Sequence, residues 1–366
     1  MLVEILALFA VLYAVQIGIF AIGSHRARYS NNPAYRPRVS IIIAARNEEA
    51  NLRPCLESIA RLTYPKELLD VVVVNDRSTD RTEEIIRDYI TAFPFMMLHN
   101  ATEDTEFGLN GKTNAVAQGI ERSRGEIILF TDADCIVPEH WVEETVKYYS
   151  EENVGLVAGF TSLRSGTLFE AVQALDWFVL FSIAAATIRL RFPVTAVGNN
   201  LSVRRKAYDA VGGYRHIPFS VTEDYALFHA ITSTGVFKAK FPVDAGTLVA
   251  SLPCENWKSL FHQKKRWFTG GAGMDMKSIS LFATGYIFKS LLLLTLAFEG
   301  VGAVVVPFLV KLGVDFLLVR PALRTFHRLD LIWAFLPFEL YYILYVVVFP
   351  PLVLFNKEVV WKGRSF

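Results

Sequence analysis

The sequence predicts an α/β fold in which a mostly parallel, Rossmann-like sheet is flanked by transmembrane helices at both ends of the chain. First, residues 39 to about 160 alternate short apolar runs with stretches of helical spacing. Second, these runs lack polar alternation, which is typical of parallel strands covered by helices on both faces. Third, 52% of the 366 residues are hydrophobic, and long apolar runs occupy both ends of the chain. We therefore expect that part of this chain lies in lipid.

The first apolar segment covers residues 2–22 and is interrupted only by Glu4, Gln16 and small residues. It is long enough to cross a hydrocarbon core of ~30 Å. A secretory signal would carry its positive charge before the apolar run, whereas here the charge follows it. The basic residues that follow are His25, Arg26, Arg28, Arg36 and Arg38. Because such residues favour the cytoplasmic side, we expect residues 1–24 to be an anchor with its amino end outside.

The anchor leads into an α/β domain, which we place at residues 39–275 in the cytoplasm. The expected strands cover residues 39–45, 71–74 and 127–130. The expected helices cover residues 48–62, 82–90, 112–123 and 141–149. Residues 168–190 are apolar and aromatic but include Glu170, Gln173, Asp176 and Arg189, so we favour an interfacial helix there over a further transmembrane helix. Residues 257–270 mix lysines with tryptophan and phenylalanine and are the second segment expected at the membrane surface.

The carboxyl-terminal region, residues 281–356, is expected to form two or three transmembrane spans. Residues 281–319 are nearly twice as long as one span requires, which favours a hairpin near residues 299–302. A basic loop at residues 320–328 follows, then an apolar run at residues 331–355 and a basic tail. With three spans the basic tail would lie outside, and with two spans the basic loop would lie outside. Neither number of spans satisfies the positive-inside rule for both basic segments. Buried core helices of a large soluble protein are the alternative, which the length of these runs disfavours.

Charge and cysteine content exclude several classes of protein. The 37 basic and 36 acidic residues give a net charge of +1 and are spread along the chain, which offers no argument for nucleic-acid binding. Cys55, Cys135 and Cys254 form no C-x-x-C pair. A disulfide framework or a zinc site is therefore not expected, and a reducing cytoplasmic compartment fits.

Asp132 and Asp134 are the most informative pair of residues. They follow an apolar run, and residues i and i+2 of a strand point to the same side. Open α/β sheets bind ligands at the carboxyl ends of their strands. Two hard oxygen ligands beside such a crevice suit a divalent cation that also holds phosphate oxygens. The alternative is an ordinary turn that carries two aspartates.

Polar residues also end the first two strands and precede a further helix. Asn47 follows Ala44 at the end of the first strand, and capping of the next helix is the alternative to a binding role. Asp76 follows the second strand, where it could accept from a base or a ribose hydroxyl or form an Asx-turn. Lys112 lies in a Gly-Lys-Thr sequence, but Glu106 occupies the position where a phosphate-binding P-loop needs glycine. Lys112 could still approach an anionic ligand at the start of a helix.

Two motifs lie later in the chain. Glu223 and Asp224 open a helix, where they either complement its dipole or supply a general base. Gln263, Arg266 and Trp267 share one side of a helix. Arginine can bind a diphosphate in bidentate fashion, and tryptophan can stack on a sugar ring. A basic amphipathic helix on anionic lipid is the alternative reading.

Taken together, these motifs resemble those of family 2 inverting glycosyltransferases with the GT-A fold. Within that family they resemble the membrane-embedded branch, which includes cellulose, hyaluronan and poly-N-acetylglucosamine synthases and ceramide glucosyltransferases. The motifs run in the family's order through residues 39–270. They lie at residues 44–48, 75–76, 112, 132–134, 198–205, 222–224 and 263–267.

The resemblance implies a role for each of these residues. Ala44, Asn47, Glu48 and Asp76 would bind the uridine side of a UDP-sugar, with Lys112 near the nucleotide. Asp132 would reach the ribose or the metal, and Asp134 would bind Mg²⁺ or Mn²⁺. Asp224 would deprotonate the acceptor hydroxyl, Arg266 and Gln263 would stabilise the departing diphosphate, and Trp267 and Glu223 would contact the acceptor. A single displacement at the anomeric carbon would invert it and give a β-linked product.

The expected function is therefore that of a multi-pass hexosyltransferase of the cell membrane with a lipid-borne acceptor. The alternative enzyme is a processive polysaccharide synthase, which would need more helices to line a channel than the three or four that the chain offers. A membrane protein that binds nucleotide sugars without turning them over is the alternative from another class. The sequence leaves open which sugar is transferred and whether a partner subunit is needed.

Overall fold

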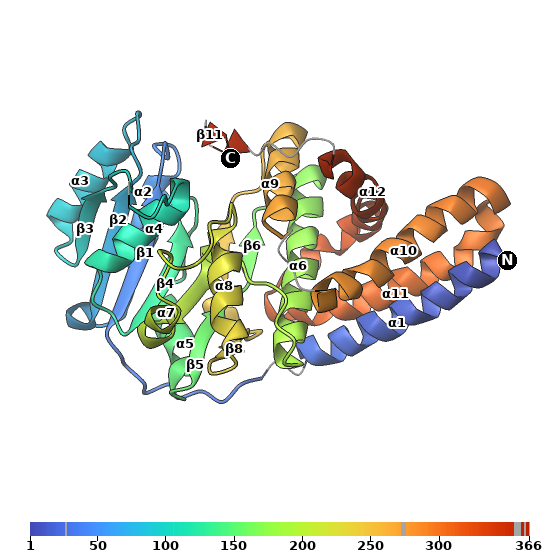
Figure 1. Cartoon of the computed structure of the whole chain (residues 1–366), viewed down its shortest axis with the longest axis horizontal. Helices are drawn as coiled ribbons and strands as arrows, with labels where there is room; N and C mark the ends of the chain where they lie inside the picture. Colours follow the sequence, from blue (N-terminus) through green and yellow to red (C-terminus); the bar gives the residue numbers. More distant parts are fainter. Residues whose placement is uncertain (26–27, 105, 272–275, 355–359, 362–363, 366) are drawn as a thin grey trace. The chain divides into compact units, whose positions relative to one another are not determined.

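The computed structural model describes residues 1–25, 28–104, 106–271, 276–354, 360–361 and 364–365 (Figure 1). The chain forms two compact units that interleave along the sequence. The sheet unit comprises Arg28–Ser162, Thr195–Leu252 and Val360–Phe366. The helical unit comprises Met1–Ala27, Leu163–Val194 and Pro253–Val359. The predicted α/β domain, residues 39–275, thus contributes two segments to the helical unit.

A seven-stranded mixed sheet with the order β3-β2-β1-β4-β7-β5-β8 organises the sheet unit. The four strands β3, β2, β1 and β4 are parallel, and β7 runs antiparallel to its neighbours β4 and β5. The strands are β1 (Val39–Ala45), β2 (Leu69–Asn75), β3 (Met96–Asn100), β4 (Ile127–Asp132), β5 (Val154–Ala158), β7 (Leu201–Arg204) and β8 (Lys238–Lys240). A smaller sheet pairs β6 (Thr161–Leu163) with β9 (Val249–Ser251). The predicted fold class is confirmed.

Helices connect the strands and cover the sheet. They are α2 (Leu52–Ala60), α3 (Thr82–Ala92), α4 (Gly111–Arg122), α5 (Trp141–Val146), α7 (Arg205–Ala210) and α8 (Glu223–Ser233). The expected helix at residues 48–62 begins four residues later than predicted, because residues 48–51 form a turn instead. The other predicted helices of the sheet unit agree with the structure to within a few residues.

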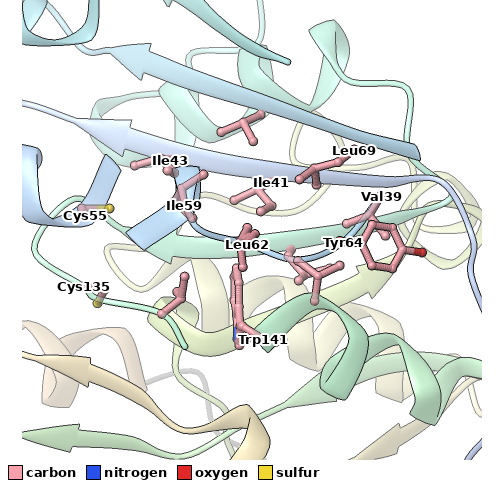
Figure 2. Packing of buried hydrophobic residues seen from close by; sticks show 14 of the residues in the cluster. Val39, Ile41, Ile43, Cys55, Ile59, Leu62, Tyr64, Leu69, Cys135 and Trp141 are labelled. Carbon is pink, nitrogen blue, oxygen red and sulfur yellow. The ribbon is translucent and has the colours of Figure 1, made fainter. Parts of the chain in front are cut away.

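A buried hydrophobic cluster joins the sheet to α2 (Figure 2). Val39, Ile41 and Ile43 alternate along β1 and point to the same face, as a strand with period two requires. Cys55 and Ile59 of α2 belong to the same cluster and are 1% and 0% exposed. All three cysteines are free thiols, in agreement with the expectation that they form no disulfide.

The helical unit consists of long apolar helices. They are α1 (Leu2–His25), α6 (Leu168–Arg189), α10 (Met276–Glu299), α11 (Val301–Thr325) and α12 (Phe335–Leu354), with the shorter α9 (Trp257–Gly270) and the 3₁₀ helix η6 (Leu329–Ala334). The helices α1, α10 and α11 lie side by side (Figure 1). Gly300 separates α10 from α11 with a φ of 81°, which places the predicted hairpin at this residue. Within the described residues, five segments are long and apolar enough to cross a membrane: α1, α6, α10, α11 and the η6–α12 segment.

The helix α6 differs from the other four in its burial. Protein covers 89% of its most apolar window, compared with 22–28% for the other candidates. The chain returns to the main sheet after α6. β7 follows α6 in the chain but pairs with β4 and β5, which precede it. A helix lying on a membrane surface would expose one face, so α6 is more completely covered than we expected.

Candidate active site

The ends of three parallel strands meet at one edge of the main sheet, as the sequence predicts. Ala44 of β1 pairs in register with Asp132 of β4, and Ala45 pairs with Asn75 of β2. Asp76 follows directly, and its backbone N–H donates to the carbonyl of Ala45 over 2.8 Å. β7 runs in the opposite direction, so its first residues reach this same edge. The edge therefore collects residues from four strands that lie far apart in the sequence.

The loop after β1 is tied to the loop after β2 by side chains. Asn47 has a φ of 52°, and its side-chain oxygen accepts from the backbone N–H of Thr79 over 2.8 Å. The backbone N–H of Glu48 donates to the Thr82 hydroxyl over 2.8 Å. The alternative in which Asn47 caps the next helix is therefore wrong, because its oxygen is used across the two loops. This contact holds Asn47, Glu48 and Asp76 at adjacent strand ends.

Asp76 is 2% exposed, although it ends a strand at the polar edge of the sheet. Its carboxylate lies 3.5 Å from the guanidinium of Arg77. Its backbone carbonyl accepts from the guanidinium of Arg46 over 2.9 Å. These contacts fix the backbone at the end of β2.

Lys112 connects the strand edge to the start of α8. It is the second residue of α4, after Gly111 with a φ of 57°. Its ammonium lies 2.6 Å from a carboxylate oxygen of Asp132 and 2.9 Å from one of Glu223. Burial alone would lower the pKa of Lys112, but the carboxylates of Asp132, Glu223 and Asp224 raise it well above its ordinary value. Lys112 therefore stays charged and holds two acidic side chains from distant segments together.

Asp224 is held beside Lys112 by backbone donors. Its carboxylate accepts from the N–H of Gly198 over 2.6 Å and from the N–H of Tyr225 over 2.8 Å. A β-carbon at position 198 would lie 2.8 Å from that of Asp224, so only glycine leaves room for this approach. Burial, and then the charge of Glu223, raise the pKa of Asp224 to about 6, against the opposing effect of Lys112. A carboxylate with a raised pKa is a stronger base than a solvated one.

These side chains line a single pocket in the sheet unit. Its polar wall consists of Lys112, Asp132, Glu223 and Asp224, and its other wall is mainly apolar. The other lining residues are Ile42, Ala44, Val116, Phe130, Thr131, Gly198, Leu201 and Tyr214. The pocket therefore brings together five of the residues named from the sequence.

Asp132 and Asp134 suit a divalent cation. The pKa of Asp134 is raised to about 6 by burial and then by the negative charges of Asp132 and Glu48, although Cys135 and Lys112 oppose this shift. A bound cation would offset the negative charges that Asp132 and Glu48 place beside the buried Asp134. Among the described residues, no group of three or more His, Cys, Asp or Glu side chains forms a preformed metal site. The donor set thus fits an ion that also takes ligands from phosphate oxygens, as Mg²⁺ commonly does.

Gln263, Arg266 and Trp267 lie on α9 in the helical unit. Their expected position beside the donor-binding residues stays a prediction. Asn256 caps α9, and its side chain accepts from the N–H of Ser259 over 3.0 Å. The ring of Trp267 lies 5.8 Å from that of Trp177 on α6.

We did not predict the pair of residues that fastens α9 to α6. Lys264 and Asp176 form a buried ion pair, with side chains 4% and 8% exposed. The ammonium of Lys264 also lies 4.6 Å from the centre of the Trp267 ring. Gln173, one turn before Asp176, exchanges two hydrogen bonds with the backbone of Cys254. The signal in the sequence was a carboxylate inside an apolar run, which we interpreted as a polar interruption of an interfacial helix.

Comparisons with known proteins identify the family of the chain. The model for the family described as glycosyl transferase family 21 matches residues 4–366. The β-monoglucosyldiacylglycerol synthase of Synechocystis is 28% identical over 64% of this chain and 48% of its own length. The poly-β-1,6-N-acetyl-D-glucosamine synthase of Staphylococcus epidermidis is 23% identical over 77% of this chain and 65% of its own length. The chain thus spans about half to two thirds of the length of these curated relatives.

A solved structure supports the fold. The mannosyltransferase PcManGT of Pyrobaculum calidifontis, determined in complex with GDP-mannose and Mn²⁺, is similar with a TM-score of 0.60 and 19% identity. The similarity covers 93% of this chain and 99% of that one. The family 2 assignment expected from the motifs is not confirmed, because the matching family model is that of family 21.

Proposed function

Because this chain belongs to glycosyl transferase family 21, we propose that it moves a sugar from a nucleotide-diphosphate donor, a UDP-sugar, to a hydroxyl group of a lipid-borne acceptor. The observation that carries the proposal is that Lys112 forms two ion pairs, one with Asp132 and one with Glu223. They join Asp132, at the edge proposed to bind the donor, to the Glu223-Asp224 pair, which is proposed to face the acceptor. Donor and base residues thus share one pocket.

In the proposed reaction Asp224 removes the proton from the acceptor hydroxyl as its oxygen attacks the anomeric carbon. Burial and Glu223 raise the pKa of Asp224 to about 6, which keeps it mostly ionised at neutral pH and more basic than an exposed carboxylate. The donors from Gly198 and Tyr225 fix the direction of its carboxylate. One displacement inverts the anomeric carbon, so an α-linked donor gives a β-linked product.

Other residues are proposed to act on the leaving diphosphate. Asp134, with Asp132, would hold Mg²⁺ or Mn²⁺, whose charge would offset that of the diphosphate. Support comes from the mutual repulsion of these carboxylates and from the Mn²⁺ bound to the structurally similar mannosyltransferase. Arg266, with Gln263, would bind the diphosphate, and Trp267 would form the floor for the acceptor. Asn47, Glu48 and Asp76 would contact the nucleoside.

A lipid acceptor is favoured over a growing polymer. One curated relative is a diacylglycerol glucosyltransferase by its name, and another is a polysaccharide synthase. Export of a polymer needs a channel lined by several helices, and the helices α1, α10 and α11 of this chain pack directly against one another. The proposed enzyme works at the cytoplasmic face of the cell membrane, where nucleotide sugars are made.

Identification of the product tests this proposal. Membranes that contain the full chain are incubated with radiolabelled UDP-sugars and extracted. We expect a chloroform-soluble product that carries a single β-linked sugar by mass spectrometry. An ethanol-insoluble polymer would instead establish the polysaccharide synthase, and binding of UDP-sugar without any product would establish a non-catalytic binding protein.

Removal of divalent metal is expected to stop transfer. Purified protein treated with EDTA should lose at least about 90% of its activity, since the diphosphate would then leave without its counter-charge. Added Mg²⁺ or Mn²⁺ should restore the activity. Asp134→Asn should weaken Mn²⁺ binding, measured directly by electron paramagnetic resonance of free Mn²⁺, whereas Asp209→Asn on the exposed surface should not. Full activity in EDTA would contradict the proposed metal role.

The Asp176–Lys264 pair is expected to influence the acceptor and not the donor. Replacing both residues with apolar ones, in Asp176→Leu with Lys264→Met, removes the ammonium from the Trp267 ring but leaves no unpaired buried charge, so folding should survive. We expect the acceptor KM to rise about tenfold, which corresponds to the loss of a cation–π contact worth ~1.4 kcal/mol. The donor KM should stay unchanged. Lys258→Gln, at an exposed position of the same helix, is the control. An unchanged acceptor KM would refute this positioning role.

A further inference from the structure

The η6–α12 segment, residues 329–354, has the length and apolarity of a membrane span. We propose that it does not cross the bilayer but forms a re-entrant element, which enters from the side of the sheet unit and returns to it. Its exposed face is then a surface for the acyl chains of the leaflet on that side. Three observations carry the inference: where the segment begins, how deep it reaches, and where it ends.

The segment begins on the side of the sheet unit. Arg328 immediately precedes η6, and its guanidinium donates to the carbonyl of Leu163 over 3.0 Å and to the hydroxyl of Ser165 over 2.5 Å. Leu163 is the last residue of β6, which pairs with β9 of the sheet unit. The loop after α11 therefore lies on the side of the sheets. As α10 also starts there, α10 and α11 together cross the bilayer twice.

The segment then reaches the middle of the bilayer. Glu339 of α12 forms an ion pair with Lys311 of α11, and both side chains are 0% exposed. Phe335 contacts Phe316 of α11, with ring centres 5.6 Å apart. Lys311 lies nine residues before Arg320, the first of the basic residues that end α11. This is about 14 Å along a helix, close to half of a ~30 Å hydrocarbon core.

The second half of α12 returns to α9. Its aromatic rings contact this helix repeatedly: Phe349 lies 5.4 Å from Phe261 and 6.4 Å from Phe268. Tyr345 lies 4.9 Å from the ammonium of Lys264. The 14 residues of α9 span about 21 Å, too short for a crossing, and α9 follows β9 closely. Since α9 stays on the side of the sheets, so does the end of α12.

One face of α12 is exposed and apolar among the described residues. Aliphatic residues recur there at every fourth position with exposures of 48–54%. They are Leu336, Leu340, Leu344, Val348 and Leu352. Ile343, on another face, is 3% exposed. A continuous aliphatic stripe beside membrane-crossing helices fits acyl chains. The strands β10 (Val360–Trp361) and β11 (Arg364–Ser365), which follow α12, belong to the sheet unit.

In this arrangement the basic loop and the basic tail can both lie on the cytoplasmic side, which was not possible with two or three carboxyl-terminal spans. With α1, α10 and α11 as the crossings, the basic loop at residues 320–328 and the basic tail lie on the same side as the sheets. Only the amino terminus and the α10–α11 turn at Gly300 lie on the opposite side. Both basic segments then obey the rule at once.

Labelling of single cysteines tests the proposal in the full chain. Cys55 and Cys135 are buried, so Cys254→Ser gives the background. Single cysteines are introduced as Ser150→Cys in the sheet unit, Glu299→Cys before the α10–α11 turn, and one residue appended after Phe366. A membrane-impermeant maleimide is applied to sealed vesicles of each orientation. We expect the appended cysteine to react from the same side as Ser150→Cys, and Glu299→Cys from the other side. If the appended cysteine reacts from the same side as Glu299→Cys, α12 crosses the bilayer and the proposal is wrong. If all three cysteines react from one side, α10 and α11 do not cross the bilayer, which also contradicts the proposal.

Spin labels test the lipid-facing stripe separately. A label at Leu344→Cys is expected to be accessible to oxygen and shielded from a water-soluble nickel chelate, as in the bilayer interior. A label at Ile343→Cys should be shielded from both. Accessibility of the Leu344 label to the nickel chelate would show that the stripe faces water and would overturn the proposed surface.

Discussion

Replacing Asp224 with asparagine is expected to reduce sugar transfer by about 10²–10⁴-fold, the usual contribution of a general base. The amide has nearly the same shape as the carboxylate. Its oxygen can still accept from the N–H of Gly198, which lies 2.6 Å from the carboxylate of the parent protein. Donor binding should therefore persist. Calorimetric titration with UDP is expected to give a Kd within about twofold of the parent protein, while the initial rate of transfer collapses.

The pH dependence of the parent protein provides an independent check. Because burial and Glu223 raise the pKa of Asp224 to about 6, kcat/KM should fall as the pH drops through this value and the base becomes protonated. Asp209→Asn, which changes an exposed carboxylate, should leave both the rate and the profile unchanged. Transfer by Asp224→Asn at the parental rate would show that another group takes the proton.

Replacing Lys311 with methionine is expected to destabilise the helical unit by about 3–5 kcal/mol, because it leaves buried carboxylates unpaired. Lys311 contacts Asp315, over 2.8 Å, and Glu339. Tyr13 of α1 donates to Asp315 over 2.7 Å, so this cluster joins α1, α11 and α12. Thermal unfolding of the protein in detergent, followed by tryptophan fluorescence, measures the effect.

Lys289→Met provides a matched control for the same measurement. Lys289 is also buried. Its ammonium contacts the rings of Tyr13 and Tyr342 and the Tyr13 hydroxyl at 3.5 Å, and within the described part of the chain it forms no ion pair with a carboxylate. Its loss should cost less than that of Lys311. The combination of Lys311→Met with Glu339→Gln should recover part of the stability, since it removes one of the unpaired charges. Equal unfolding temperatures for Lys311→Met and the parent would contradict a stabilising role of the cluster.

The strand-end residues could be predicted from the sequence because they follow apolar runs directly. Asp76 and Asp132 needed only the assumption of a parallel sheet to be placed at one edge. The contact of Lys112 with Glu223 could not be predicted, because it joins segments 111 residues apart through the placement of α8. The burial of α6 could not be predicted for a different reason. An apolar run has the same composition whether protein or lipid surrounds it, so the sequence did not reveal how completely protein covers α6 before the chain returns to pair β7 with β4 and β5.

That same pairing imposes an order on synthesis. When the first 162 residues have left the ribosome, β4 still has one free edge, and β5 has no partner in the main sheet, because β7 comes later in the chain. Until α6 and residues 201–204 have been made, the free edge of β4 and both edges of β5 stay open to pairing with other chains. The nascent protein therefore carries an incomplete sheet while α1 is already available to the membrane, and holding it there would keep it apart from other unfinished copies in the cytosol.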